Sequence, residues 1–112
     1  MVEQLDLLAA VRPYTEPQKV SGRQHLLALE ALYAASERGM TGEEVAVYCR
    51  FRATHIATTR LGEMADDRER FPVPLVARSE KKDRPTASGR MAYRWFLTDC
   101  GREFVEQGRA VA

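Results

Sequence analysis

The sequence predicts a mainly α-helical domain with one small β-hairpin, an α+β fold. Two Ser/Thr-x-x-Gln/Glu boxes each precede apolar residues at three-to-four spacing, which indicates two helix starts. Pro72 and Pro74 then end the helical part, and apolar residues alternate from Met91 to Leu97, as in a half-buried strand. The predicted order is three helices, a strand, a basic loop, a second strand and a last helix. The 112 residues suit a single domain.

The first helix is expected to begin at Ser21, because SGRQ places a Gln three residues after a Ser and so forms a capping box. Gly39 stands where a helix commonly ends in the left-handed conformation. The apolar stripe between them consists of Leu26, Leu29, Leu32 and Tyr33. Residues 1–20 are expected to form an N-terminal arm or a short helix, and residues 21–112 the folded domain.

The second helix is short and begins at Thr41, where TGEE is another capping box. Its apolar side consists of Val45, Ala46 and Cys49. The third helix is expected from about Thr54 to Ala65.

The third helix divides into two faces when its residues are placed at about 100° intervals. The apolar face consists of Ala53, Ile56, Ala57, Leu61 and Met64. The opposite face holds short, uncharged side chains, namely His55, Thr58, Thr59 and Gly62. An ordinary solvated face would carry more Lys and Glu, and two arginines, Arg50 and Arg52, precede this helix. The pattern favours a ligand-contacting face over a plain solvated one.

The hairpin is expected to join a strand at Leu75–Arg78 to a strand at Met91–Leu97. Alternation puts four residues of the second strand on one face: Met91, Tyr93, Trp95 and Leu97. Trp95 is expected to lie in the core. The intervening SEKKDRPTASG is too long for a tight turn and rich in bases. Thr98 is the expected cap of a last helix that runs from Asp99 to about Gln107 and ends at Gly108, with Phe104 and Val105 facing inward.

The net charge of +1 conceals a strong segregation of charge. Residues 50–60 and 78–94 together hold nine basic and two acidic residues, a balance of +7, whereas the remainder holds eight basic and fourteen acidic residues, a balance of −6. A phosphate backbone responds to a local basic patch and not to the total charge. The distribution therefore favours a nucleic-acid partner.

Several other functions find no support in the sequence. Cys49 and Cys100 are too far apart for a CxxC pair, and no spacing among the Cys and His residues resembles a zinc site. No HExxH, P-loop or paired-carboxylate motif occurs, so neither an enzyme nor a cofactor is predicted, and no small-molecule effector is indicated. No apolar run approaches the ~20 residues of a membrane span. Glu3 and Asp6 stand where a signal peptide would be basic, so a cytoplasmic protein is expected.

The stretch SGRMAYRWFLTDCGRE, Ser88 to Glu103, is similar to the wing strand and the Leu-Thr-x-x-Gly-Arg helix start of the winged helix-turn-helix family, MarR-like branch. The resemblance covers roughly residues 21–108 and departs from the family at Arg50, where Gly is frequent. It implies that the third helix enters the major groove of DNA while the basic loop forms a wing against the backbone or an adjacent minor groove. It implies recognition by His55, Thr58 and Thr59.

Physical considerations agree with this assignment. Thr can bond a base edge or touch a thymine methyl in a groove about 12 Å wide, and arginines at the flanks suit phosphates. The residues expected to contact DNA are Arg52, Thr54, His55, Thr58, Thr59, Arg60, Lys81, Lys82, Arg84 and Arg90.

The sequence thus predicts a sequence-specific, double-stranded-DNA-binding transcriptional regulator. A homodimer is expected because two half-sites give specificity, with contacts through segments 2–11 and 99–108. The apolar residues expected to carry these contacts are Leu5, Leu8, Phe104 and Val105. Two alternatives remain open: a winged-helix protein-interaction module in a nucleoprotein assembly, and an accessory subunit of an enzyme with no nucleic-acid role.

Overall fold

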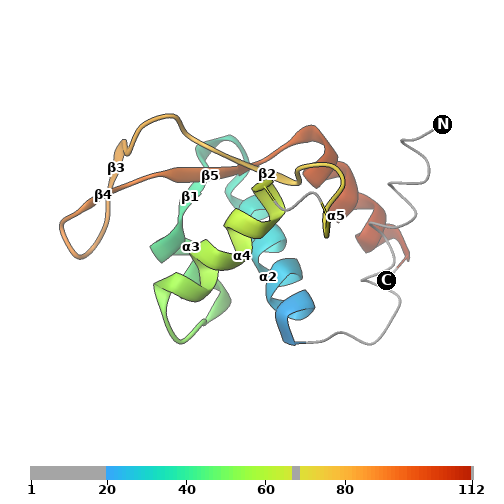
Figure 1. Cartoon of the computed structure of the whole chain (residues 1–112), viewed down its shortest axis with the longest axis horizontal. Coiled ribbons are helices and arrows are strands. Elements are labelled where there is room, and N and C mark those ends of the chain that lie inside the picture. The colour runs from blue at the N-terminus through green and yellow to red at the C-terminus, as the bar shows by residue number, and fades with distance from the viewer. Residues whose placement is uncertain (1–19, 67–68, 112) are drawn as a thin grey trace.

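A computed structural model describes residues 20–66 and 69–111, which hold four α-helices and small antiparallel sheets (Figure 1). The helices are α2 (Val20–Ala35), α3 (Gly42–Cys49), α4 (Thr54–Asp66) and α5 (Asp99–Val111), and a short 3-10 helix, η1 (Ser36–Arg38), follows α2. The strands are β1 (Met40–Thr41), β2 (Val76–Arg78), β3 (Arg84–Pro85), β4 (Met91–Ala92) and β5 (Arg94–Leu97). The predicted α+β class is confirmed. Within these residues no helix has the length and apolarity needed to cross a bilayer.

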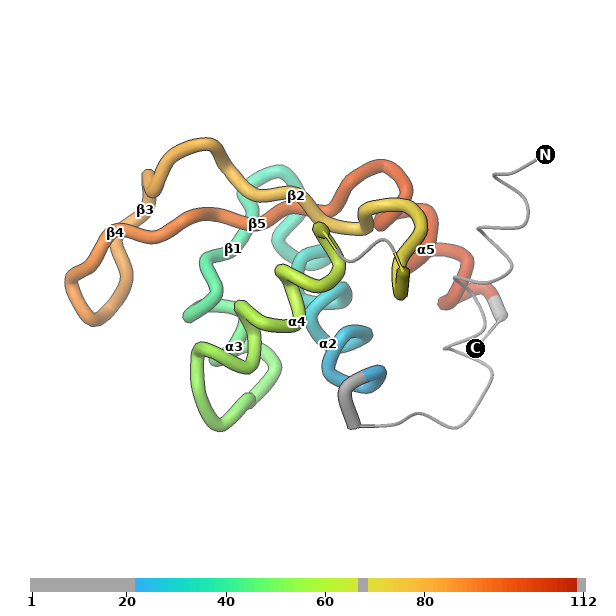
Figure 2. The backbone as a smooth tube through the Cα atoms, viewed as in Figure 1, coloured from blue at the N-terminus to red at the C-terminus, as the bar shows by residue number. Residues whose placement is uncertain are grey.

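The main sheet has β5 at its centre, in the order β1-β5-β2. Both neighbours run antiparallel to β5, and Met40 of β1 pairs with Trp95. The sequence analysis missed β1. Strands β3 and β4 form a second, two-stranded sheet on the same hairpin. We call residues 76–97 the hairpin and residues 84–92 the outer hairpin. The outer hairpin extends from one end of the molecule, and α5 lies at the other end (Figures 1 and 2).

The core lies where α2, α3 and α4 meet the main sheet and α5. Its largest fully enclosed side chains are Leu29, Leu32, Leu61, Met64, Val45, Val76, Val105 and Thr41. Phe104 is 3% exposed and Val105 is 0% exposed, so the prediction that they face inward is confirmed. Their burial also makes them unavailable for the dimer contact expected from segment 99–108. The other expected contact segment, 2–11 with Leu5 and Leu8, lies outside the described residues.

Both ends of α2 differ from the prediction. The helix already includes Val20, so Ser21 stands inside it and not at its N-cap. At the other end α2 gives way to η1 after Ala35, and Gly39 follows with φ 70° and ψ 179°. This positive φ suits Gly, but the extended ψ is not that of a left-handed helix cap. A Cβ at Gly39 would lie 2.6 Å from the Phe96 ring, so Gly39 lets the chain pass close to β5.

The start of α3 and the turn into α4 follow local rules. Thr41 Oγ1 accepts a hydrogen bond from Glu44 N at 3.1 Å, and Glu44 Oε1 accepts one from Thr41 N at 2.9 Å. The predicted capping box is therefore confirmed. Arg50 then adopts the left-handed conformation, with φ 58° and ψ 39°. The turn thus has the geometry that Gly favours, although Arg occupies it, and α4 begins at Thr54 as predicted.

The hairpin is interrupted at Tyr93, where the sequence predicted one continuous strand. Ser79 N donates to Arg94 O at 2.8 Å, but Arg94 N donates to the Ser79 hydroxyl at 3.0 Å, so a side chain replaces one backbone acceptor of the ladder. The same hydroxyl donates to Lys81 O at 2.8 Å, which bends the chain out of the main sheet. Beyond the bend, β3 pairs with β4 and shortens the apparent loop. We call residues 86–90 the tip, and in it Gly89 has φ 87°.

The joint between the hairpin and α5 is tightly built. Thr98 Oγ1 accepts from Gly101 N at 3.0 Å and donates to Pro74 O at 2.8 Å, while Thr98 N donates to Leu75 O at 3.1 Å. The predicted N-cap is therefore confirmed, and the same residue binds the segment that leads into β2. Gly101 lies against the Leu75 backbone, and a Cβ there would collide with the Leu75 carbonyl oxygen.

The prediction that Gly108 ends α5 was wrong, because the helix continues to Val111. Contacts with α2 extend along this last part. Tyr33 donates to Glu106 at 3.1 Å, and Arg109 donates to Glu30 at 2.6 Å while its guanidinium lies 4.4 Å from the centre of the Tyr33 ring. An interior Gly costs a helix only about 1 kcal/mol, a cost that such tertiary contacts can offset.

Candidate nucleic-acid interface

The two faces of α4 are separated as the sequence predicted for three of the five apolar positions, whereas Ala53 and Ile56 are half-buried and lie outside the core. Ala57, Leu61 and Met64 are each 0% exposed and pack in the core. His55, Thr58 and Thr59 are exposed on the outward face, and Thr54 is exposed at the start of the helix. The acidic residues of α4 are Glu63 and Asp66, so the first two turns present an outward surface without a carboxylate. We call His55, Thr58 and Thr59 the outward face.

Thr58 is less free than its neighbours on this face. Its hydroxyl donates to the carbonyl oxygen of His55 at 3.2 Å, within its own helix. Its methyl group packs against Gly42 at the start of α3, and a Cβ at Gly42 would collide with that methyl. Thr58 therefore fixes the approach of α3 to α4. His55 and Thr59 form no side-chain hydrogen bond with other described residues and are the better candidates to contact a ligand.

Arg60 is placed away from the outward face. Its Nη1 donates to Glu63 Oε1 at 2.8 Å, and its buried Nε has no hydrogen-bond partner among the described residues. Glu63 also binds His25 of α2, whose Nε2 lies 2.8 Å from Glu63 Oε1. The structure thus brings Arg60 to the junction of α2 and α4, where its contacts are internal. The i,i+3 spacing of Arg60 and Glu63 is a local signal for their pair, whereas the contact of Glu63 with His25, 38 residues away, has no such signal.

His25 is a buried histidine, 5% exposed, with the ring of Phe71 packed edge-on at 5.0 Å. Burial lowers the pKa of His25 from its ordinary value of 6.5, against the opposing effect of its hydrogen bond with Glu63. The positive charges of Arg60 and Arg70 lower this pKa further. The neutral imidazole therefore donates its Nε2–H to the Glu63 carboxylate.

We expect the stability of the protein to fall as the pH drops below about 6.5. The folded protein holds the His25 proton less tightly than the unfolded chain, so protonation favours unfolding, and this contribution is fully present only above 6.5. His25→Gln retains an N–H donor for Glu63 but does not titrate. Urea unfolding at about pH 5 and about pH 7.5 should show a smaller loss of unfolding free energy in H25Q than in wild type. Equal losses would contradict the assignment to His25.

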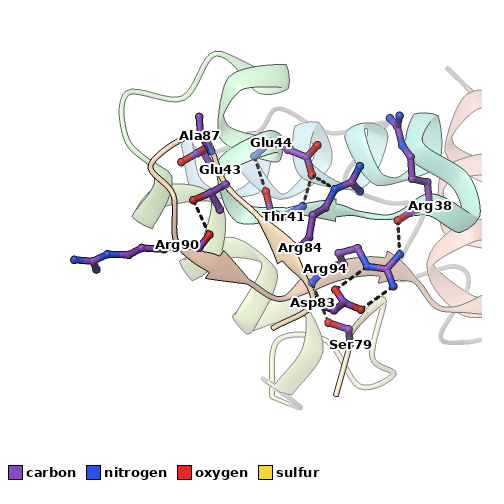
Figure 3. A network of polar contacts seen from close by, with 11 residues as sticks. Arg38, Thr41, Glu43, Glu44, Ser79, Asp83, Arg84, Ala87, Arg90 and Arg94 are labelled. Atoms are coloured by element: carbon purple, nitrogen blue, oxygen red, sulfur yellow. Dashed lines mark hydrogen bonds and ion pairs between the residues drawn. The ribbon is translucent and has the colours of Figure 1, made fainter. Parts of the chain in front are cut away.

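The basic side chains of the hairpin fall into two groups. Arg94 forms a bidentate salt bridge with Asp83, in which Nε donates to Oδ1 and Nη2 to Oδ2, both at 2.9 Å. Its Nη1 donates to Arg38 O at 3.1 Å. The bonding with Arg94 lowers the pKa of Asp83. Arg84 lies 3.6 Å from Glu44 Oε1. Arg94 thus joins β5 to the segment at Asp83 and to η1, and Arg84 joins β3 to α3 (Figure 3).

The remaining hairpin bases are exposed. Lys81, Lys82 and Arg90 make no ion pair with another described residue, and Arg90 points away from the other residues drawn in Figure 3. Lys82 lies 5.5 Å from the centre of the Tyr93 ring, and Arg78 lies over the same ring at 3.9 Å. Arg78 was not among the expected contacts, although its position at the end of β2 puts it beside them. Arg52 is likewise exposed, in the turn before α4.

Glu43 connects the tip to the helices. Its Oε1 accepts a hydrogen bond at 2.8 Å from the backbone N–H of Ala87, 44 residues away in the sequence. Since Gly42 packs against Thr58, the N-terminus of α3 touches both the tip and the outward face of α4. The sequence indicated Glu43 only as part of the TGEE helix start. The contact could not be anticipated, because it needs the position of the tip.

The Cys49 thiol is partly buried between α2 and α3. Burial raises the pKa of Cys49 to about 11, and the thiol donates a hydrogen bond from Sγ to Leu27 O at 3.2 Å. A protonated thiol is a poor nucleophile and a poor metal ligand. In the described part of the chain, no three His, Cys, Asp or Glu side chains gather closely enough to hold a metal ion.

Comparison with known proteins adds no assignment: no family model matches this chain, and no curated protein or solved structure matches it significantly.

Proposed function

We propose that this protein is a winged helix-turn-helix, sequence-specific DNA-binding regulator. In this proposal α4 is the recognition helix in the major groove, and the hairpin is the wing. The observation that carries the proposal is the position of the tip, which Glu43 joins to the start of α3 beside the outward face of α4. The outward face of α4, which carries no carboxylate, and the exposed basic residues of the hairpin thus belong to one side of the fold.

The described side chains support a division of roles. Lys81, Lys82, Arg90 and Arg52 are exposed and unpaired among the described residues, so they are suited to phosphates, which fix orientation without reading sequence. His55 and Thr59 are exposed and short, so they are suited to base edges in the major groove. Arg60 and Arg84 retain internal partners and have smaller roles than the sequence suggested. A homodimer remains part of the proposal because two half-sites increase specificity.

A second candidate function is a protein-interaction module in a nucleoprotein assembly. The observation that favours it is the exposure of two large apolar side chains on α3, Val47 at 74% and Tyr48 at 54%. Exposed apolar groups of this kind frequently belong to protein contacts.

Contact with phosphates by the hairpin and reading of bases by α4 can be separated by titrating DNA duplexes at two salt concentrations. Removal of Lys81, Lys82 and Arg90 should weaken binding to preferred and scrambled duplexes alike, and each lost phosphate contact should reduce the slope of log K against log salt by about 0.9. Thr59→Ala should instead cost about 1–3 kcal/mol on the preferred duplex, with an unchanged slope.

Arg102→Ala is the matched control, because Arg102 is an exposed base on α5, at the opposite end of the molecule from the tip (Figure 1). It should leave both affinity and slope near the wild-type values. A hairpin triple variant that behaves like R102A would show that the hairpin does not contact DNA. A wild-type protein that binds no duplex would overturn the proposal and favour the protein-interaction module.

A further inference from the structure

The outer hairpin has few polar attachments to the helices. In the described part of the chain, two such contacts reach it from α3: Ala87 N donates to Glu43 Oε1 at 2.8 Å, and Arg84 Nε lies 3.6 Å from Glu44 Oε1. Of these, only the Glu43 contact reaches the tip. It is a short hydrogen bond from a backbone N–H to a carboxylate, which is stronger than its neutral counterpart.

The outer hairpin has little stability of its own. Strands β3 and β4 are two residues long each, and an isolated two-stranded ribbon is marginal at best in water. The apolar anchoring at Trp95 lies in β5, inward of the interruption at Tyr93. Met91 of β4 is 50% exposed and adds little. The orientation of the tip therefore depends on its contact with α3.

We propose that Glu43 is a positioning residue that holds the tip at a set place beside α4. This inference rests on the proposed function, since the tip matters as part of a DNA-binding surface. Glu43 acts through Ala87 and does not itself touch DNA. Its negative charge is unfavourable near phosphates, so the residue has two opposing effects: the charge lowers affinity for any duplex, and the hydrogen bond keeps the tip in the place where it contributes to discrimination.

Two substitutions separate these effects. Glu43→Gln removes the charge but retains a side-chain oxygen that can accept the Ala87 N–H. Glu43→Ala removes both. Glu37→Ala is the charge-matched control, because Glu37 is exposed on η1 and its side chain forms no hydrogen bond or ion pair with the described residues of the outer hairpin.

The first measurement needs no DNA. Amide hydrogen exchange of Ala87, followed by NMR, should be slow in wild type and E37A, intermediate in E43Q and at least about tenfold faster in E43A, because a broken hydrogen bond leaves the amide open to solvent. Unchanged exchange in E43A would overturn the proposal, whatever the protein binds.

The second measurement compares affinities for preferred and scrambled duplexes. E43Q should bind both duplexes a few-fold more tightly than wild type, with an unchanged ratio of the affinity for the preferred duplex to that for the scrambled one. In E43A this ratio should fall roughly tenfold, a loss of the size expected for one specific base contact. Identical ratios in E43Q and E43A would show that Glu43 acts through its charge alone and would refute the positioning role. If wild type binds no duplex, the proposed function fails, and the exchange of Ala87 still decides whether Glu43 holds the tip.

Discussion

Gly101→Ala is expected to destabilise the protein by about 3–5 kcal/mol, from ~1–3 kcal/mol of overpacking and ~1 kcal/mol for each of two hydrogen bonds placed at risk. The added methyl would collide with the Leu75 carbonyl oxygen, which is backbone and cannot rotate away. The displaced segment includes the acceptors of both Thr98 donors, Pro74 O and Leu75 O. Guanidinium unfolding followed by circular dichroism measures this effect.

Gly62→Ala is the control for this substitution. Gly62 also lies within a helix, α4, but a Cβ there would meet no atom within 4 Å. It should therefore stabilise the protein by up to about 1 kcal/mol through helix propensity. If G101A were as stable as G62A, the close contact between α5 and the Leu75 backbone would not exist in solution.

Trp95→Ala is expected to cost about 3–5 kcal/mol of unfolding free energy. Trp95 is 9% exposed and sits in the central strand, where it pairs with Met40 of β1 and Arg78 of β2. Its loss would leave a cavity beneath the strand that joins both edges of the main sheet. Urea unfolding gives the free energy, and the loss of tryptophan signal requires circular dichroism as the probe.

Met91→Ala provides the comparison, because the sequence pattern put Met91 and Trp95 on the same face of one strand. Met91 is 50% exposed, beyond the interruption at Tyr93. Its truncation should cost about 0.5 kcal/mol or less, as at other surface positions. Similar costs for the two variants would mean that the ring of Trp95 is not enclosed, and a role in stacking on bases would then become attractive.

The parts of the fold that sequence analysis predicted correctly depend on neighbours in the sequence. The capping box of Thr41 and Glu44 closes within three residues, and the cap of Thr98 on Gly101 does the same. The inward face of α4 follows from the helical period. Such features can be predicted from residues a few positions apart, without knowledge of any tertiary contact.

Most of the parts that were missed depend on short elements or on distant partners. β1 has two residues, too few for a periodic pattern. The break at Tyr93 arises from the Ser79 hydroxyl, 15 residues from its donor Arg94. Charge alone suggested that Arg84 was available to DNA, whereas Glu44, far away in the sequence, contacts it in the structure. The pair of Arg60 with Glu63 is an exception, because its i,i+3 spacing on one helix is a local signal that the sequence analysis overlooked. Whether a basic side chain is free or in an ion pair depends on where the acidic side chains lie in the folded protein.

The contact between Thr58 and Gly42 couples the outward face of α4 to the start of α3. A larger residue at position 42 has no room beside α4, because the Thr58 methyl already occupies the space that a Cβ at Gly42 would need. Such a substitution would push the start of α3 outward, and Glu43 would move with it. A change at position 42 would therefore reach both the outward face of α4 and the tip, and in the proposed function it would alter the reading helix and the wing together.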